Sequence, residues 1–344
     1  MTKLSTQTEN NRPVAIWLLI CCALVFAMVV LGGVTRLTGS GLSMVDWRPI
    51  MGVLPPLTDV QWEETFALYQ RSPEFEKINA GMDVQGFKGI FWLEYLHRLL
   101  GRTIGIVFLL PFVFFLWAGR IRKHELPRYL LMFVLGGLQG LLGWYMVKSG
   151  LVDNPHVSQY RLTAHLIAAF LIYAYMFWVA MGLLFPRPPQ RSRLYPWTLW
   201  LTGLITITVI SGGFVAGLKA GFGFNTFPTM GGQWIPEGLM MLEPAWLNFF
   251  ENPVTAQFDH RVLAIATLLA VIVYWAFARR EQLPGRIRPG VHLLLAVALA
   301  QVVLGIATLL LIVPVPLAVA HQAVAMVLFT IALYLCQGLK GESR

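Results

Sequence analysis

The chain has 344 residues, of which 57% are hydrophobic and only 12% are charged. Soluble globular domains carry about a quarter charged residues, so this composition excludes a soluble enzyme, and the high hydrophobicity excludes a disordered chain. A membrane helix needs about 20 apolar residues, so the chain has room for eight spans. The formal net charge of +9 therefore reports orientation first, and we expect the lipid bilayer, not nucleic acid, as the partner.

Apolar windows bounded by charges or by Pro/Gly clusters predict eight membrane spans in chain order, at residues 14–36, 95–118, 127–147, 160–184, 195–217, 257–278, 290–312 and 316–338. The first window is too long for the core of a signal peptide and no small-residue cleavage site follows it, so we interpret it as a retained span. Between the first two windows, Asp59–Tyr69 mixes apolar and acidic side chains and predicts a short amphipathic helix on the outer surface.

Basic residues indicate the orientation of these spans. They gather at the N-terminus, after the second, fourth and sixth windows, and at the C-terminus. Because successive spans cross the membrane in opposite directions, these five segments lie on the same side of it. The positive-inside rule then puts both termini in the cytoplasm and the long segments 37–94 and 218–256 on the outer side. We expect a multi-pass protein of the bacterial inner membrane.

The two halves of the chain repeat the same motifs in the same order. The pairs are Gly32-Gly33 with Gly212-Gly213, Pro49–Gly52 with Pro228–Gly231, His97-Arg98 with His260-Arg261, Gln139 and Gly143 with Gln301 and Gly305, and Ala164-His165 with Ala320-His321. Like-numbered spans run in the same direction, so the repeat is parallel and its pseudo-twofold axis follows the membrane normal. The sequence predicts an all-α polytopic protein with two four-helix bundles, residues 1–184 and 185–344.

Four of the seven histidines, His97, His165, His260 and His321, lie near the outer ends of even-numbered windows and form two equivalent pairs. A lone intramembrane histidine could simply hydrogen-bond a neighbouring helix, but two matched pairs favour ligation. Two imidazoles facing each other in a four-helix bundle suit the axial positions of a haem iron. Zinc would need three or four ligands, and the cysteines form neither CxxC nor CxxCH. We expect one haem in each half, near the outer leaflet.

Polar residues beside the first histidine of each pair differ between the halves. Arg98 and Arg261 follow these histidines, and both a contact with haem propionates and snorkelling to the headgroups stay open. Three residues before the histidines, the first half has Glu94 and the second has Gln257. An interfacial acid paired with Arg98 is the simpler interpretation of Glu94 alone. The broken symmetry instead favours proton or charge handling by Glu94, with chemistry in the first half and electron transfer in the second.

These residues resemble a known family. The string Glu94-Tyr95-Leu96-His97-Arg98, the repeated halves and the four histidines are similar to haem A synthases. Phe214–Gly221 and Asn225–Pro228 look like the proteobacterial and mitochondrial branch. The resemblance implies oxidation of the C8 methyl group of haem O to a formyl group, through hydroxylated intermediates, which gives haem A for cytochrome c oxidase.

By the same resemblance, His97 and His165 flank the substrate haem O in residues 1–184, and Glu94 assists at the reacting methyl group. His260 and His321 ligate the iron of a haem b cofactor in residues 185–344. The long outer segments contain no cysteine, so the disulfide-based role of some family members is absent. The implied partners are haem O, delivered by haem O synthase, and an electron acceptor that the sequence does not identify. Both a monomer and a homo-oligomer stay open.

A second class of function is a dihaem b-type electron carrier, in which both haems stay bound and only their oxidation state changes. The difference between Glu94 and Gln257 and the unequal outer segments favour an enzyme, because a relay does not need two different halves. A transporter is less favoured, since the bundles offer paired histidines and not broken helices around an ion site.

The orientation makes a first prediction. Alkaline phosphatase, which is active only outside the cytoplasm, should be active when fused at Ala80 and inactive when fused at Arg286. Green fluorescent protein fused at the same positions should give the reverse pattern. Activity of one reporter at both positions would contradict the eight-span topology.

Overall fold

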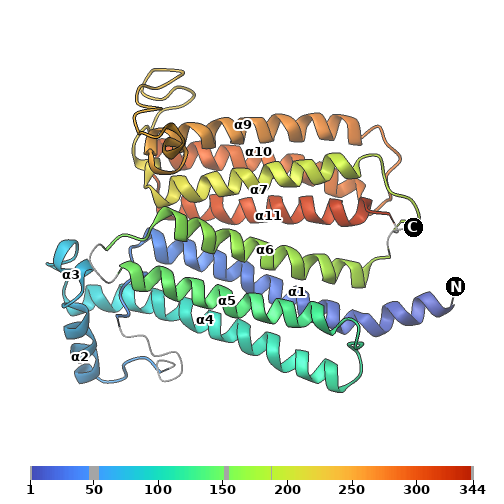
Figure 1. The fold of residues 1–344 in the computed structure, drawn as a ribbon, viewed down its shortest axis with the longest axis horizontal. Helices are drawn as coiled ribbons and strands as arrows, with labels where there is room; N and C mark the ends of the chain where they lie inside the picture. The colour runs from blue at the N-terminus through green and yellow to red at the C-terminus, as the bar shows by residue number, and fades with distance from the viewer. Residues whose placement is uncertain (1, 46–53, 151–154, 187, 342–344) are drawn as a thin grey trace.

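In the computed structural model, which describes residues 2–45, 54–150, 155–186 and 188–341, eight long helices run side by side (Figure 1). They are α1 (Thr2–Leu37), α4 (Val84–Trp117), α5 (Leu126–Gly150), α6 (Gln159–Leu184), α7 (Tyr195–Gly217), α9 (Pro253–Ala278), α10 (Arg288–Leu310) and α11 (Val315–Leu339). All eight are long and apolar enough to cross a membrane, which confirms the predicted spans. The described residues form no strand beyond one isolated bridge between Met230 and Gln233.

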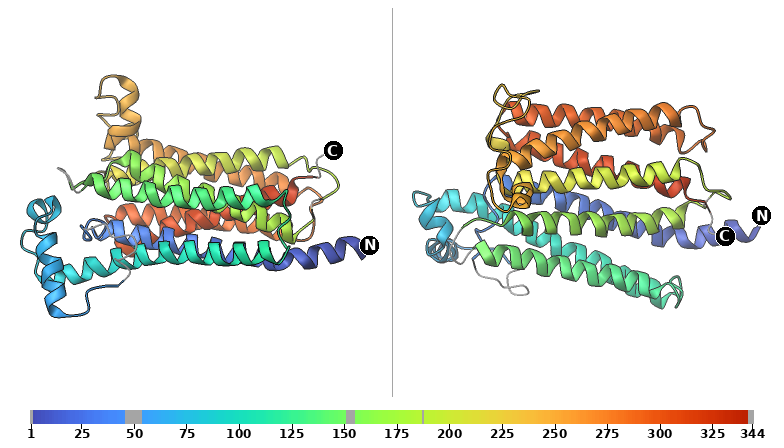
Figure 2. Two further views of the ribbon diagram at one scale, coloured as in Figure 1. Left: turned by 60° about the horizontal axis from the view of Figure 1, so that its bottom comes forward. Right: turned by 45° about the horizontal axis from the view of Figure 1, so that its top comes forward.

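The helices form two bundles of four. In the first half, α1 contacts α4, α4 contacts α5, α5 contacts α6, and α6 returns to α1. In the second half, the same ring runs through α7, α9, α10 and α11. The helices α4 and α6 therefore lie diagonally across the first bundle, and α9 and α11 lie diagonally across the second. Figure 2 shows the same helices side by side in two further views. Both chain termini lie at one end of the molecule and the long loops lie at the other (Figure 1).

The helix α4 begins well before its apolar window, at Val84 and not at residue 95. The Asp83 side chain caps its first turn by accepting from the Gly86 N–H at 2.8 Å. Phe87, Phe91 and Tyr95, spaced four residues apart on one face, are buried and continue the helix beyond the hydrophobic stretch. As a result, His97 lies in the interior of a rigid helix and not at its end.

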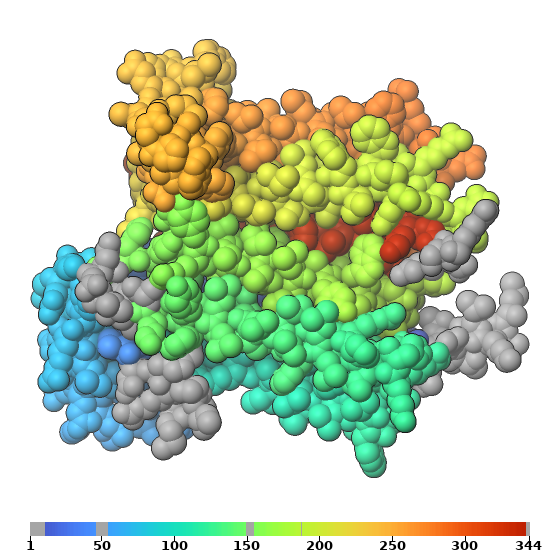
Figure 3. Space-filling model, viewed as in Figure 1, coloured from blue at the N-terminus to red at the C-terminus, as the bar shows by residue number. Residues whose placement is uncertain are grey.

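A small helical cap covers this extension of α4. It contains α2 (Asp59–Tyr69), which matches the predicted amphipathic helix and begins with a capping box between Thr58 and Gln61. Trp62 of α2 is buried and packs edge-on against Phe91, with ring centroids 5.0 Å apart. The cap and the second long loop project separately from the same end of the molecule (Figure 3).

The cap also buries an acid. Glu74, in the short helix α3 (Pro73–Lys77), is 6% exposed. Burial raises the pKa of Glu74 to about 7, although a hydrogen bond donated by the Tyr69 hydroxyl at 3.1 Å opposes the shift. Asn79 donates in turn to that hydroxyl at 2.8 Å. These bonds tie α2 to α3 and give the cap a polar core of its own.

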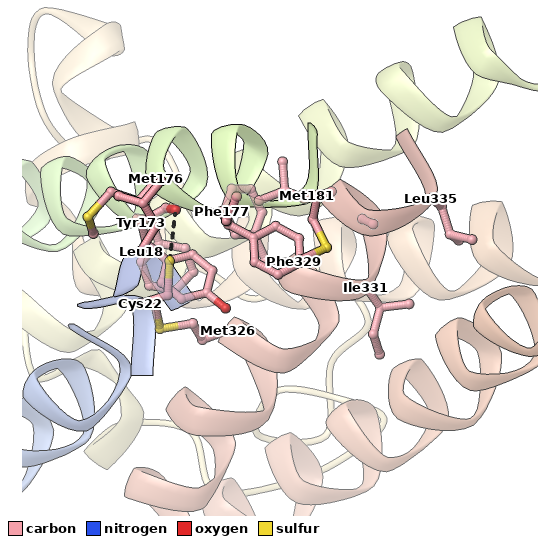
Figure 4. Packing of buried hydrophobic residues seen from close by; sticks show 14 of the residues in the cluster. Leu18, Cys22, Tyr173, Met176, Phe177, Met181, Met326, Phe329, Ile331 and Leu335 are labelled. Carbon is pink, nitrogen blue, oxygen red and sulfur yellow. Dashed lines mark hydrogen bonds between the residues drawn. The ribbon is translucent and has the colours of Figure 1, made fainter. Parts of the chain in front are cut away.

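The two bundles meet through α1, α6, α7 and α11. Side chains from three of these helices form one apolar core (Figure 4), in which Phe170 and Phe329 lie 5.4 Å apart and the Cys22 thiol donates to the Tyr173 carbonyl at 3.9 Å. Towards the end that carries the long loops the backbones approach closely, since a Cβ on Gly217 would lie 2.5 Å from the Gln159 Cα. Small residues permit such contacts between membrane helices.

A proline in α4 leaves one backbone carbonyl without its hydrogen bond inside the helix, and a side chain on α1 supplies the missing donor. Pro111 has no N–H, so the Val107 carbonyl loses its intrahelical partner. The Trp17 indole on α1 donates to this carbonyl at 2.9 Å. An unsatisfied backbone group is costly in hydrocarbon, so this bond couples the conformation of α4 to its packing on α1.

The coupling between Trp17 and Pro111 can be measured. Trp17→Phe should lower the free energy of unfolding by about 1–3 kcal/mol, because the carbonyl is left unpaired. In a Pro111→Ala background the restored backbone N–H donates to the Val107 carbonyl, so Trp17→Phe should lower the free energy of unfolding by less. Unfolding in mixed detergent micelles measures both values, with Trp197→Phe, at an exposed side chain, as the control. An equal cost in both backgrounds would contradict the explanation.

Candidate functional site

The structure places the four histidines of the two repeat pairs on the diagonal helices. His97 lies on α4 and His165 on α6. His260 lies on α9 and His321 on α11, and the centroids of their rings are 6.5 Å apart with the planes at 87°. Each bundle therefore presents two imidazoles across its core.

The spacing in the second bundle fits an iron held between two imidazoles. A metal–imidazole bond is about 2 Å long, and the centre of the ring lies about 1 Å beyond the bonding nitrogen, which gives roughly 6 Å between the centres of two opposed rings. The observed 6.5 Å agrees with this value. Among the described residues, no group of three or more His, Cys, Asp or Glu side chains could hold a metal ion. The donor set thus suits haem, which needs two axial ligands.

A glycine on a neighbouring helix faces each of the four imidazoles. A Cβ built on Gly32 of α1 would lie 3.0 Å from the Cε1 of His97, and one on Gly143 of α5 would lie 3.0 Å from that of His165. The corresponding distance is 3.1 Å from Gly212 of α7 to His260, and 2.9 Å from Gly305 of α10 to His321. Histidines occupy one diagonal of each bundle and glycines occupy the other.

The sequence repeat contained these glycines, but their purpose was missed. Gly32 and Gly143 lie far from their histidines in sequence, so only the packing of the helices shows that they leave room for the rings. Glutamines one turn earlier on α5 and α10 complete the surroundings. The Gln139 side chain donates to the His165 carbonyl at 2.8 Å, and the Gln301 amide nitrogen lies 3.5 Å from Nε2 of His321.

The Glu94 carboxylate is buried and holds the loop that follows α1. One oxygen accepts from the Ser43 hydroxyl at 2.7 Å and from the Met44 N–H at 2.8 Å. The other oxygen forms an ion pair with Arg98 at 2.5 Å, and Arg98 also donates to the Met44 carbonyl at 3.0 Å. Glu94 is thus paired with Arg98, yet it is 3% exposed and not an acid at the surface.

The second half repeats this arrangement with the neutral Gln257 in place of Glu94. The Gln257 side chain donates to the Phe224 carbonyl at 3.3 Å, and Arg261 donates to the same carbonyl at 2.7 Å. Phe224 is the repeat counterpart of Met44. Arg261 also donates to the carbonyl of Thr226 at 2.8 Å. Both arginines therefore anchor a long loop at the end of their bundle, a role that neither sequence interpretation included. The repeated string Pro49–Gly52 lies outside the described residues.

Fold and site together define a polytopic membrane protein with two repeated bundles, each of which presents a pair of histidines suited to haem. The chain belongs to the COX15-CtaA family of cytochrome oxidase assembly proteins, which it matches over residues 15–333.

Curated relatives match nearly the whole chain. It is 52% identical over 337 residues to a protein named Heme A synthase from Nitrosospira multiformis, covering 96% of this chain and 95% of the relative. It is 53% identical over 338 residues to the Heme A synthase of Nitrosomonas eutropha, with the same coverage. Heme A synthase COX15 of Arabidopsis thaliana is 45% identical over 349 residues, which cover 97% of this chain and 76% of the plant protein.

The glycine contacts make a prediction about haem content. Gly212→Ala should displace the His260 ring and lower the haem bound per protein, measured by the pyridine haemochrome method, because its Cβ would meet the ring at 3.1 Å. Gly203→Ala on the same helix is the matched control, since nothing lies within 4 Å of the added Cβ. Equal haem content in both variants would show that the close contact does not position the ring.

Proposed function

We propose that this protein is a haem A synthase, which oxidises a methyl group of haem O to a formyl group to give haem A. Family membership and the names of relatives about half identical over nearly the full chain support the proposal. The observation that carries it at the level of the site is the pair of diagonal histidine sites, symmetric in scaffold but different at Glu94 and Gln257.

In this proposal the two halves bind different haems. His97 and His165 hold the substrate haem O in the first bundle, and His260 and His321 hold a haem b cofactor in the second. Bound haem supplies one-electron redox chemistry at its iron. Gly32 and Gly212 leave room for the first imidazole of each pair, and Arg98 and Arg261 close the outer loops over the sites. Contacts of these arginines with haem propionates are compatible with that role.

Glu94 is the group proposed to handle protons. A methyl group that becomes a formyl group loses electrons and protons, so a nearby proton acceptor or anion assists the reaction. Glu94 lies one turn before His97 on α4, and its Ser43 and Met44 partners belong to the outer loop. Protons accepted there have a short route to the outer side. The counterpart Gln257 cannot accept a proton at neutral pH.

The surroundings complete the proposal. The protein lies in the lipid bilayer with both termini in the cytoplasm and the haem sites near the periplasmic side. Haem O is hydrophobic and reaches the site from haem O synthase in the same membrane. The proposal leaves the electron acceptor unassigned.

A dihaem electron carrier is the second candidate. The glycine–histidine contacts favour it, because they are nearly identical in the two bundles, as a relay with two permanent haems would require. Extraction and chromatography of the pigments separates the two functions. Haem B together with haem O or haem A supports the enzyme, whereas haem B alone supports the carrier.

Glu94→Gln tests the proposed chemistry. The glutamine can keep bonds to the outer loop, as Gln257 does in the second half, so folding and haem b should survive. We expect haem A formation to fall by about 100-fold or more, with haem O accumulating in chromatograms of the extracted pigments. Glu64→Gln, at an exposed position of α2, should leave the product unchanged. Normal haem A production by a folded Glu94→Gln protein would remove Glu94 from the mechanism.

A further inference from the structure

The four imidazoles differ in the surroundings of their Nδ1 atoms. The Nδ1 atoms of His97, His165 and His321 are buried and have no hydrogen-bond partner. The Nδ1 of His260 lies 2.8 Å from the hydroxyl of Ser211 on α7. One ligand of the second bundle therefore has a support that neither ligand of the first bundle has.

The bonds of Ser211 also determine the tautomer of His260. The Ser211 hydroxyl has one hydrogen, which it donates to the Thr208 carbonyl at 2.8 Å. It must therefore accept from His260, so the proton of the ring lies on Nδ1 and the lone pair lies on Nε2. Nε2 is then the atom free to bind iron, and the ring is prepared for ligation before a haem enters.

Ser211 directly precedes Gly212, the glycine that faces the same ring. Two successive residues of α7 thus hold His260, one through the hydroxyl and one by leaving room for the imidazole. Their repeat counterparts are Leu31 and Gly32. The glycine is retained in the first half, but the leucine side chain cannot accept a hydrogen bond, so the repeat is broken at the hydroxyl that contacts Nδ1 of His260.

We propose that Ser211 is a positioning residue that makes His260 the stronger axial ligand, so that the second bundle retains its haem while the first bundle, without such support, exchanges haem. A hydrogen bond at Nδ1 fixes the orientation of a ligating imidazole and makes its other nitrogen more basic, and loss of such a partner typically costs 10- to 100-fold in metal affinity. A resident cofactor needs slow release, whereas a substrate site must release its product. The inference rests on the proposed function, since it requires one haem in each half.

The test measures release of haem b from purified protein to an excess of apomyoglobin, together with the midpoint potential of haem b. Ser211→Ala should release haem b at least about 10-fold faster. Its potential should rise, because a less basic ligand stabilises the ferric state less. Ser211→Thr keeps a hydroxyl and should restore both values. Thr206→Ala is the matched control on α7, since the Thr206 hydroxyl donates to its own helix at the Thr202 carbonyl.

A reciprocal variant probes the first half. Leu31→Ser supplies a hydroxyl at the equivalent position and should slow the release of haem O from the first bundle to apomyoglobin. Unchanged release and potential in Ser211→Ala, or equal changes in Thr206→Ala, would overturn the role of Ser211. Purified protein that never contains haem O or haem A would contradict the proposed function. The role of Ser211 can still be tested in that case, because the release of haem b from the second bundle stays measurable.

Discussion

The contact between a glycine and an imidazole on the adjacent helix is the constraint on which the rest of the structure depends. Each histidine must point into the core of its bundle at a depth where the helices are packed side by side, and a single Cβ there would meet the ring at about 3 Å. The positions of Gly32, Gly143, Gly212 and Gly305 therefore fix which helices lie next to each other at the site. The diagonal arrangement of the histidines follows from this packing.

A few polar groups differ between the two halves of an otherwise symmetric scaffold, as the proposed division into a substrate half and a cofactor half requires. Glu94 and Gln257 occupy equivalent places and bind equivalent outer loops, yet only one of them carries charge. Ser211 and Leu31 differ in the same way on the helix that faces the first histidine. Duplicated bundles allow such differences, because a polar substitution in one half leaves the packing of the other intact.

Hydropathy was enough to predict all eight spans and the short helix at Asp59–Tyr69, because both depend on local composition. The start of α4 was missed, since residues 84–94 are held in a helix by the Asp83 cap and by packing against the helical cap and not by their own hydrophobicity. The pairing of Glu94 with Arg98 was among the interpretations of the sequence, but the loop partners of both residues were missed. Ser43 and Met44 lie about fifty residues away in sequence, and a backbone carbonyl leaves no signal in the pattern of side chains.

The parallel repeat has a consequence for the membrane potential. The second histidine of each pair lies within two turns of the start of its helix, and the glycines that face the first histidines lie within two turns of the end of theirs, so all four lie near the long loops. Moving one charge across a membrane costs about 2.3 kcal/mol per 100 mV. In the proposed function, an electron that passed between the two haem sites would travel parallel to the bilayer and would do no such work. The rate of that redox step would then not depend on the membrane potential.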